Sequence, residues 1–215
     1  MRENSRADVG FNNILKNVAQ YYEEKIEMYG ATARGVDWNS SESQSLRFEQ
    51  LLKVCDQAQI FSINDYGCGY GALVEYMNNR GYIFRYRGFD ISDQMIANAQ
   101  NLHQGLDYCE FFTDEFLLAA ADYTVASGVF NVKLQTSNQE WEDYMLHTLN
   151  RIAELSEKGF AFNVLTMYSD SDRMRTDLYY ADPLFLFDYC KRHFSRFVSL
   201  LHDYPLYEFT VLVRK

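Results

Sequence analysis

The stretch NDYGCGYG, residues 64–71, combines a carboxylate with three glycines at alternate positions. The carboxylate is Asp65 and the glycines are Gly67, Gly69 and Gly71. Because glycine has no Cβ atom, a bound molecule can contact the backbone N–H groups of such a segment. A short β-branched segment precedes the glycines and a helical pattern follows them, and a helix that begins after a glycine loop attracts anionic groups. The stretch therefore predicts a binding site for a nucleotide-like molecule.

A second carboxylate, Asp90, lies at the end of the next expected strand, 23 residues after Gly67. In doubly wound folds, an acid about 20 residues beyond the first glycine binds the ribose hydroxyls of a nucleotide. An acidic residue at the exposed start of a helix is the alternative interpretation of Asp90. The strand, glycine loop and helix that precede it favour the ribose-binding role.

The spacing within the glycine loop distinguishes two kinds of ligand. Dinucleotide sites use the pattern G-x-G-x-x-G, whose third glycine lets the helix pack closely on the strand. The pattern here is D-x-G-C-G-x-G, with Asp65 on the strand side of the loop. A carboxylate at that position repels a pyrophosphate and attracts an ammonium group. The loop favours a ligand with an ammonium group, and a nucleotide-dependent oxidoreductase on a related fold is the less favoured alternative.

Four segments, in order along the chain, resemble the motifs of class I S-adenosylmethionine (SAM)-dependent methyltransferases. They are NDYGCGYG for the first motif, YRGFDIS for the second, FFTDEF for the third and DYTVASGVF for the fourth. The resemblance covers roughly residues 60–215, and the segment RGVDWNSSESQSLRFEQLL also resembles the N-terminal part of some bacterial members. It implies a methyltransferase with a seven-stranded sheet in which one strand near the end is antiparallel.

The resemblance also implies how each matching residue contacts SAM. Asp65 would reach the amino group of the methionine moiety, directly or through water. Gly67 and Gly69 would lie against that moiety, with Cys68 as a small neutral filler between them, and Asp90 would accept hydrogen bonds from both ribose hydroxyls. The other expected contacts are the adenine face for Ile91, the adenine amino group for Asp114, and the sulfonium end for Ser127 and Gly128. Apart from the resemblance, Arg47 on the second expected helix is a candidate for the cofactor carboxylate, and a solvated arginine is the alternative.

Methyl transfer from a sulfonium is an in-line displacement, so the protein must align the acceptor, exclude water and remove a proton if the acceptor is a hydroxyl. An amine acceptor needs only to be neutral. We expect the acceptor-binding groups at the carboxyl ends of the fourth and fifth strands and on the N-terminal helices. The candidate bases are His202, beside Asp203, and the pair Tyr168 and Asp170 after the fifth strand. Phe130, Asn131, Trp38 and Asn39 are further candidates around the acceptor or cofactor, and ordinary packing or solvent exposure is the alternative for each.

Apolar periodicity indicates the elements that position these residues. Residues 11–29 carry one apolar stripe at helical spacing, with Gly30 as C-cap. A second helix is expected from Ser41, with Gln44 completing a capping box. Short β-branched or aromatic segments then alternate with helical ones, which is typical of a mostly parallel sheet covered on both faces. The connection around Pro205 is too short for a crossover, so the last two strands are expected to pair antiparallel.

These elements predict an α/β fold: a Rossmann-like, doubly wound, seven-stranded sheet with an antiparallel C-terminal hairpin and an N-terminal helical cap. Residues 1–56 are expected to form the cap or lid, and residues 57–215 the methyltransferase domain.

Charge and composition narrow the classes of partner. The net charge of −10 repels phosphates, so a nucleic-acid partner is not expected. No apolar run has membrane-spanning length, and the N-terminal MRENSRADVG lacks the apolar core of a signal peptide. The four cysteines form no C-x-x-C pair and no cluster with histidine, so no metal site is expected. A cytoplasmic protein with reduced thiols and no membrane partner is the prediction.

The predicted function is therefore transfer of a methyl group from SAM to an oxygen or nitrogen of an unidentified small molecule. A non-catalytic SAM-binding module is the main alternative, because the cofactor residues stand out in the sequence and the catalytic residues do not.

Overall fold

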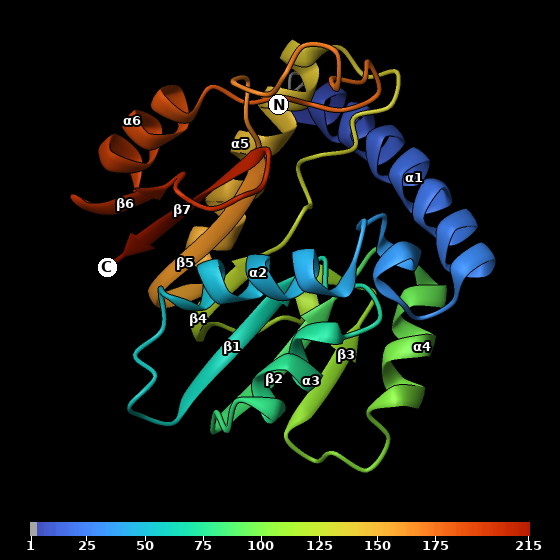
Figure 1. The fold of residues 1–215 in the computed structure, drawn as a ribbon, viewed down its shortest axis with the longest axis vertical. Helices are drawn as coiled ribbons and strands as arrows, with labels where there is room; N and C mark the ends of the chain where they lie inside the picture. Colours follow the sequence, from blue (N-terminus) through green and yellow to red (C-terminus); the bar gives the residue numbers. More distant parts are fainter. Residues whose placement is uncertain (1–3) are drawn as a thin grey trace.

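The computed structural model describes residues 4–215 and shows one seven-stranded sheet between layers of helices (Figure 1). The strand order across the sheet is β3-β2-β1-β4-β5-β7-β6. The strands are β1 (Phe61–Tyr66), β2 (Phe84–Phe89), β3 (Cys109–Phe112), β4 (Ala121–Ala126), β5 (Ser156–Leu165), β6 (Phe197–Leu201) and β7 (Glu208–Arg214). This order confirms the predicted Rossmann-like, doubly wound fold.

Six strands run in the same direction, and β7 runs antiparallel to them between β5 and β6. Only a short turn joins β6 to β7, which is why the last pair forms a hairpin as the sequence predicts. The chain builds the sheet outwards from β1 in one direction and from β4 in the other. In open α/β sheets, ligands bind beyond the carboxyl ends of the strands at such a switch point. The ends of β1 and β4 carry Asp65 and Ser127.

The helices are α1 (Asn4–Tyr29), α2 (Ser41–Leu52), α3 (Ala72–Asn79), α4 (Asp93–Leu102), α5 (Asn138–Glu154) and α6 (Pro183–His193), with short 3₁₀ helices η1 (Ala33–Val36) and η2 (Glu115–Leu117). The capping box of α2 lies one residue earlier than predicted. Ser40 is the N-cap and exchanges hydrogen bonds with Ser43, so Gln44 has no part in it. Ser43 replaces the usual Glu or Gln because its hydroxyl reaches back to the Ser40 amide at 3.3 Å.

Two apolar clusters form the core, one on each face of the sheet. Successive residues of β5 alternate between them: Phe160 and Phe162 belong to the cluster with α5 and α6, and Ala161 to the cluster with α2 and α3. Trp141 of α5 is fully buried, and its indole N–H donates to the Phe130 carbonyl at 2.9 Å. The core thus fixes the β4 and β5 ends, where acceptor-binding groups were expected.

The two N-terminal helices have different surroundings. In α2, Leu51 and Leu52 are fully buried in the cluster beside α3, so this helix belongs to a layer that covers the sheet. Helix α1 contacts η1 and α4 and lies at one edge of the molecule (Figure 1). The division into a cap of residues 1–56 and a domain of residues 57–215 remains a prediction, and α1 with η1 is the part that resembles a cover.

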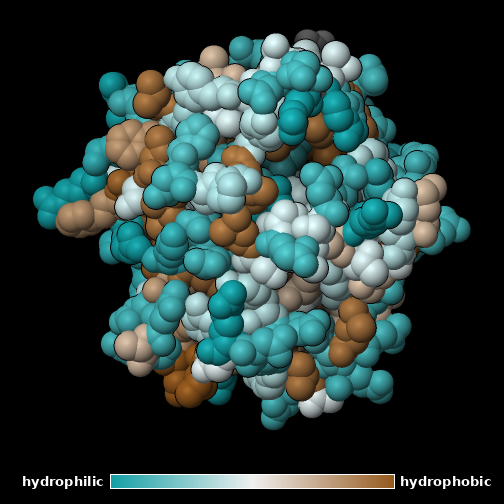
Figure 2. Space-filling model, in the orientation of Figure 1, coloured by the Kyte–Doolittle hydropathy of each residue, from teal (hydrophilic) through white to brown (hydrophobic). Residues whose placement is uncertain are grey.

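Within residues 4–215, no helix is both long and apolar enough to cross a membrane. Hydrophilic residues cover most of the face shown in Figure 2, and hydrophobic residues appear there in small separate groups.

Candidate functional site

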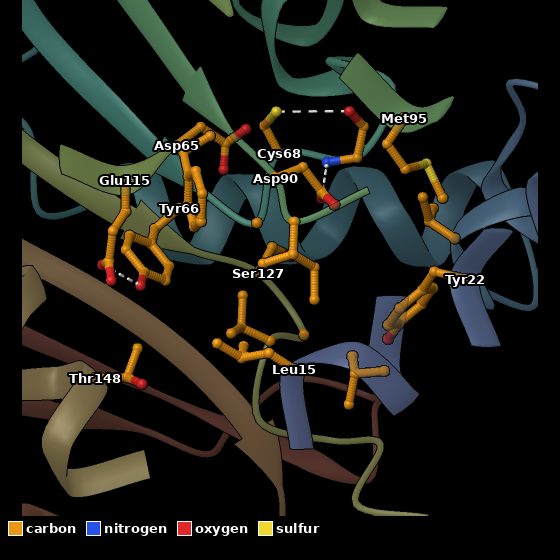
Figure 3. A pocket seen from close by; sticks show the side chains of 18 of the residues that line it. Leu15, Tyr22, Asp65, Tyr66, Cys68, Asp90, Met95, Glu115, Ser127 and Thr148 are labelled. Atoms are coloured by element: carbon orange, nitrogen blue, oxygen red, sulfur yellow. Dashed lines mark hydrogen bonds between the residues drawn. The ribbon is translucent and has the colours of Figure 1, made fainter. Parts of the chain in front are cut away.

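A cavity of about 410 Å³ lies beyond the carboxyl ends of β1, β2 and β4, and we call it the main cavity. The glycine loop, the ends of these strands, α1 and α5 all contribute to its wall. Figure 3 shows Asp65, Asp90 and Ser127 around the space, with Tyr22 of α1 and Glu115 on opposite sides. The position is the switch point of the sheet, where a nucleotide site was expected.

The glycine loop adopts a backbone that other residues rarely take. Gly67, Gly69 and Gly71 have φ angles of +79°, +54° and +79°. A Cβ atom on Gly67 would lie 2.5 Å from the side chain of Val129, and one on Gly69 would lie 2.8 Å from that of Val36. Both the backbone conformation and the lack of room for a Cβ atom therefore favour glycine at Gly67 and Gly69. The loop is also tied to β2, because the Gly67 and Cys68 amides donate to the Phe89 carbonyl at 2.7 and 2.9 Å.

Asp90 is held at the wall of the main cavity by backbone donors. The Gly69 amide donates to its Oδ2 at 2.8 Å (Figure 3), and the Ser92 amide donates to its Oδ1 at 3.0 Å. A carboxylate has about four acceptor positions, so each oxygen keeps capacity for another donor. Burial raises the pKa of Asp90 to about 6. The sequence predicted an acid at this place, and the structure orients it towards the glycine loop.

Asp65 also lines the main cavity and is only 3% exposed. The Tyr86 hydroxyl donates to its Oδ2 at 2.7 Å. Burial raises the pKa of Asp65 to about 7, the Tyr86 hydrogen bond opposes that rise, and the charge of Asp90 adds to it. Asp65 and Asp90 thus lie in the wall of the same cavity, an arrangement suited to a ligand with a cationic group.

The residues after β4 form a further part of the wall. The Ser127 Oγ is buried and has no hydrogen-bond partner within residues 4–215. Gly128 has a φ angle of +74°, and a Cβ atom there would lie 2.4 Å from the ring of Trp38. Its amide donates to the Asn163 side-chain oxygen at 2.8 Å. Ser127 and Gly128 therefore lie where they were expected, with the Trp38 indole packed against them.

Arg47 does not line the main cavity, although the sequence suggested it for the cofactor carboxylate. Its Nε donates to Glu208 Oε2 at 2.8 Å, and both side chains are buried. Its Nη1 donates to the Ser43 carbonyl, and its guanidinium carbon lies 3.8 Å from the ring centre of Trp38. A buried guanidinium requires a paired charge, and β7 supplies one. No pattern in the sequence indicates Glu208 as the partner, because the two residues are 161 positions apart.

Asp114 is exposed and caps η2, accepting from the Phe116 amide at 2.9 Å. It does not line the main cavity, whereas its neighbour Glu115 does and accepts from the Tyr66 hydroxyl at 2.8 Å. The turn into η2 directs the two consecutive carboxylates differently. The structure places Ile91 and Cys68 in the cavity wall as expected, and burial raises the pKa of the Cys68 thiol well above its usual value, which keeps the sulfur neutral.

The three candidate bases lie outside the main cavity. His202 and the adjacent Asp203 are exposed just after β6, and the His202 ring lies against Phe209. Tyr168 is 62% exposed, and Asp170 accepts from the Tyr207 hydroxyl. The structure thus places these residues at the surface around the β6–β7 turn. His202 follows the last residue of β6, so alternation along the strand allows its side chain to point outwards.

Sequence reasoning missed several polar residues of the main cavity. Tyr22 comes from α1, and Tyr144, His147 and Thr148 come from α5. His147 is exposed, but it lines the cavity with its ring 5.2 Å from that of Phe11. The one available signal for these residues is that polar groups border the apolar stripe of each helix. This signal does not single out a cavity, because polar groups also border the stripe where a helix meets solvent.

A second cavity of about 460 Å³ adjoins the first and shares three of its residues, Tyr22, Val36 and Trp38. Asn131, expected near the acceptor, and Asn39, expected near the cofactor, both line it. In the part of the chain that the structure describes, no three His, Cys, Asp or Glu side chains gather as metal ligands would.

Comparison with known proteins gives consistent results. The family model described as "Methyltransferase domain" matches residues 64–158. A Mycobacterium tuberculosis protein named "Putative methyltransferase Rv1506c" is 49% identical over 164 residues, which span 76% of this chain and 99% of that protein.

Solved structures share the fold at low identity. The N-methyltransferase NodS from Bradyrhizobium japonicum WM9, in complex with S-adenosylhomocysteine (SAH), has a TM-score of 0.63 at 14% identity, covering 92% of this chain and 98% of that one. The magnesium protoporphyrin IX methyltransferase from Synechocystis PCC 6803, with bound SAH, has a TM-score of 0.60 at 15% identity, covering 81% and 84%.

Proposed function

Since the chain belongs to the class I SAM-dependent methyltransferases, we propose that the main cavity binds SAM and that the protein methylates a small molecule on oxygen or nitrogen. The observation that carries the proposal is the pair of carboxyl groups in one cavity. Asp65 is buried beneath the glycine loop, and Asp90 is held open to the cavity by two backbone amides. Such a pair suits a ligand that has both an ammonium group and a ribose.

The residues present fit SAM on three independent features. The glycine loop leaves space that Cβ atoms would fill. The Ser127 Oγ is a buried hydroxyl that lacks a partner within residues 4–215, so a ligand can supply one. The two acids offer acceptors for two of the SAM groups that donate hydrogen bonds, the ammonium and the ribose hydroxyls. We assign the ammonium to Asp65 and the ribose to Asp90, with Ile91 against the adenine.

When bound, SAM supplies an activated methyl group on a sulfonium, so the reaction is an in-line displacement. The residues of this chain bind SAM, orient it and shield it from water. Gly67 and Gly69 let the ligand lie against the loop backbone, and α1 covers the cavity with Leu15, Val18 and Tyr22. Covering the cavity excludes water, which strengthens the electrostatic contacts inside it. Trp38, packed over Gly128, borders both cavities and marks the side from which an acceptor would approach.

A small acceptor is supported by the size and charge of the molecule's surfaces. The second cavity, at about 460 Å³, is in the range of small-molecule sites. The net charge of −10 opposes binding of a nucleic-acid backbone.

Calorimetry on the purified protein tests the cofactor part of the proposal. SAH is expected to bind and NAD is not, because Asp65 would repel a pyrophosphate. Binding of NAD tighter than that of SAH would refute the assignment. The transferase part is tested by mass spectrometry of SAM incubated with the protein and pools of small hydroxyl and amine compounds. Asp90→Asn, which is expected to bind SAM more weakly, should form less of any methylated product at a SAM concentration that does not saturate it.

A further inference from the structure

The second cavity lies between the segment around Trp38 and a long loop after β5. Two isolated bridges hold that loop, one between Thr166 and Ala181 and one between Val132 and Leu178. The Asp177 carbonyl accepts from the amides of residues 133 and 134 at 3.1 and 2.9 Å. The wall that this loop provides is therefore anchored to the end of β4, beside the sulfonium side of the main cavity.

Guanidinium groups dominate the charged lining of this cavity. Arg47, Arg173 and Arg175 line it, against the single carboxylate of Asp37. Arg47 is already paired with the buried Glu208, so Arg173 and Arg175 are the guanidiniums of the lining that a ligand can meet. Two guanidiniums on one wall favour an anionic ligand.

Asp37, the acidic residue of the lining, is already bound by side chains of α1. Asp37 accepts from the Tyr21 hydroxyl at 2.6 Å and pairs with Lys25 at 2.8 Å, both from α1. Its charge is thus offset by Lys25, and it adds little repulsion towards an anion in the cavity.

The arginines differ in how much of each guanidinium is free. Arg175 is fixed by two hydrogen bonds to Asp177, which engage its Nε and Nη2. Arg173 is 66% exposed, and its nearest acid is Asp170 at 4.0 Å, which is itself 59% exposed. An exposed pair at that distance is weak and can be exchanged for a ligand. A guanidinium has five N–H donors, so both arginines retain donors for a further oxyanion.

The remaining wall is largely apolar and aromatic. It includes Leu165, Leu178, Tyr180, Leu206 and Tyr207. The Arg173 guanidinium also lies 5.6 Å from the ring centre of Tyr207. The combination suits a molecule with an apolar or aromatic body and one anionic end.

We propose that the second cavity is the acceptor site and that its ligand carries an oxyanion, either a carboxylate or a phosphate, bound by Arg173 and Arg175. This inference rests on the proposed function, because it takes the main cavity as the SAM site. Trp38 separates the two sites, so the anionic end lies away from the sulfonium and the acceptor atom lies near Trp38 and Gly128.

The test is calorimetric titration of SAH-saturated protein with benzoate, phenyl phosphate and the neutral isostere benzamide. Benzoate and phenyl phosphate are expected to bind, and the stronger of the two identifies the type of oxyanion. The variant Arg173→Gln, alone and combined with Arg175→Gln, should weaken that binding about tenfold or more, as loss of charge-assisted hydrogen bonds predicts. The single variant is included because Arg175→Gln also removes the pair with Asp177.

Arg192→Gln is the matched control, because Arg192 is exposed on α6 and pairs only with Asp188 among the described salt bridges. It should leave binding unchanged. Equal affinity for benzamide, insensitivity to both arginine variants, or no binding of either anion at millimolar concentration would overturn the inference. Failure of SAH itself to bind would instead contradict the proposed function, so the two failures are distinguishable.

Discussion

The guanidinium of Arg47 lies over the ring of Trp38, 3.8 Å from the ring centre. Arg47 also donates to Glu208, Glu208 accepts from Asn163, and Asn163 accepts from the Gly128 amide, with distances of 2.8, 2.9 and 2.8 Å. The Trp38 ring in turn packs on Gly128. These contacts form a closed circuit that joins α2, β5, β7 and the end of β4. The circuit holds the indole between the two cavities.

Glu208→Gln should destabilise the protein by about 3–5 kcal/mol, because it leaves the buried charge of Arg47 without its partner. Glutamine keeps an oxygen that can accept from Asn163, so the charge pair is the main loss. The double variant Arg47→Met with Glu208→Gln should recover much of the stability, since it removes both charges. Urea unfolding of the three proteins gives the comparison. A single variant as stable as the parent would show that the pair contributes little.

Gly128→Ala should destabilise the protein more than the same change at Gly105. Both glycines have positive φ angles, +74° and +86°, so the backbone penalty of about 1–2 kcal/mol is shared. Only at Gly128 does the new Cβ meet Trp38, because nothing lies within 4 Å at Gly105. Displacing the ring should add about 1–3 kcal/mol and weaken SAH binding. Equal losses of stability in the two variants, measured by urea unfolding, would mean that Trp38 moves aside freely.

Asp90→Asn should weaken SAH binding by about 2–3 kcal/mol, or roughly 30- to 160-fold, because charge-assisted hydrogen bonds to the ribose are lost. Asp93→Asn is the matched control, an exposed acid three residues along at the start of α4. It should bind SAH as the parent does. Calorimetry at constant ionic strength measures both variants, and equal affinity of Asp90→Asn and the parent would remove Asp90 from the ribose site.

The parts of this site that the sequence predicted are those built from contiguous residues. The glycine loop, Asp90 and Ser127 follow strands directly, so strand alternation and loop spacing are enough to place them. Arg47, Asp114 and Glu208 show where such reasoning fails. The partner of Arg47 is fixed by packing between distant elements, and a 3₁₀ turn decides that Glu115, and not Asp114, lines the cavity.

The helical contributions to the site could not be predicted for a related reason. The apolar stripe of α1 was recognised, but a stripe does not tell whether it packs on a core or lines a cavity. In the structure it does both: Ile14 and Val18 join the core, and Leu15 and Tyr22 line the main cavity.

Residues 11–22 of α1 should become more protected from hydrogen exchange when SAH binds. Leu15, Val18 and Tyr22 line the main cavity, so a ligand adds contacts that oppose opening of the helix. Helix α6 lines neither cavity and provides the control within the same sample. Equal protection of α1 with and without SAH, measured by mass spectrometry, would show that α1 is fixed structure and not a lid.

SAH affinity should rise with pH up to about pH 7 and then level off. In the free protein, burial raises the pKa of Asp65 to about 7 and that of Asp90 to about 6. The ammonium group favours the ionised form of Asp65, so binding must displace the proton of any carboxyl group that is protonated. Below the pKa of such a group, displacing its proton lowers the affinity about tenfold for each pH unit. The slope of the logarithm of SAH affinity against pH should therefore approach one between pH 7 and 6, and two below pH 6.

The stability of the free protein should change in the opposite direction over the same interval. A carboxyl group with a raised pKa binds its proton more tightly in the folded chain than in the unfolded one, so stability falls as pH rises from about 4 through 7. Asp65→Asn has no such proton: at about pH 8 it should be more stable than the parent, and it should bind SAH more weakly. Its SAH affinity should also lose the slope between pH 7 and 6, while the slope from Asp90 remains. A parent affinity that stays constant from about pH 5.5 to 8 would show that both carboxylates are already ionised in the free protein, and burial would then not control the site.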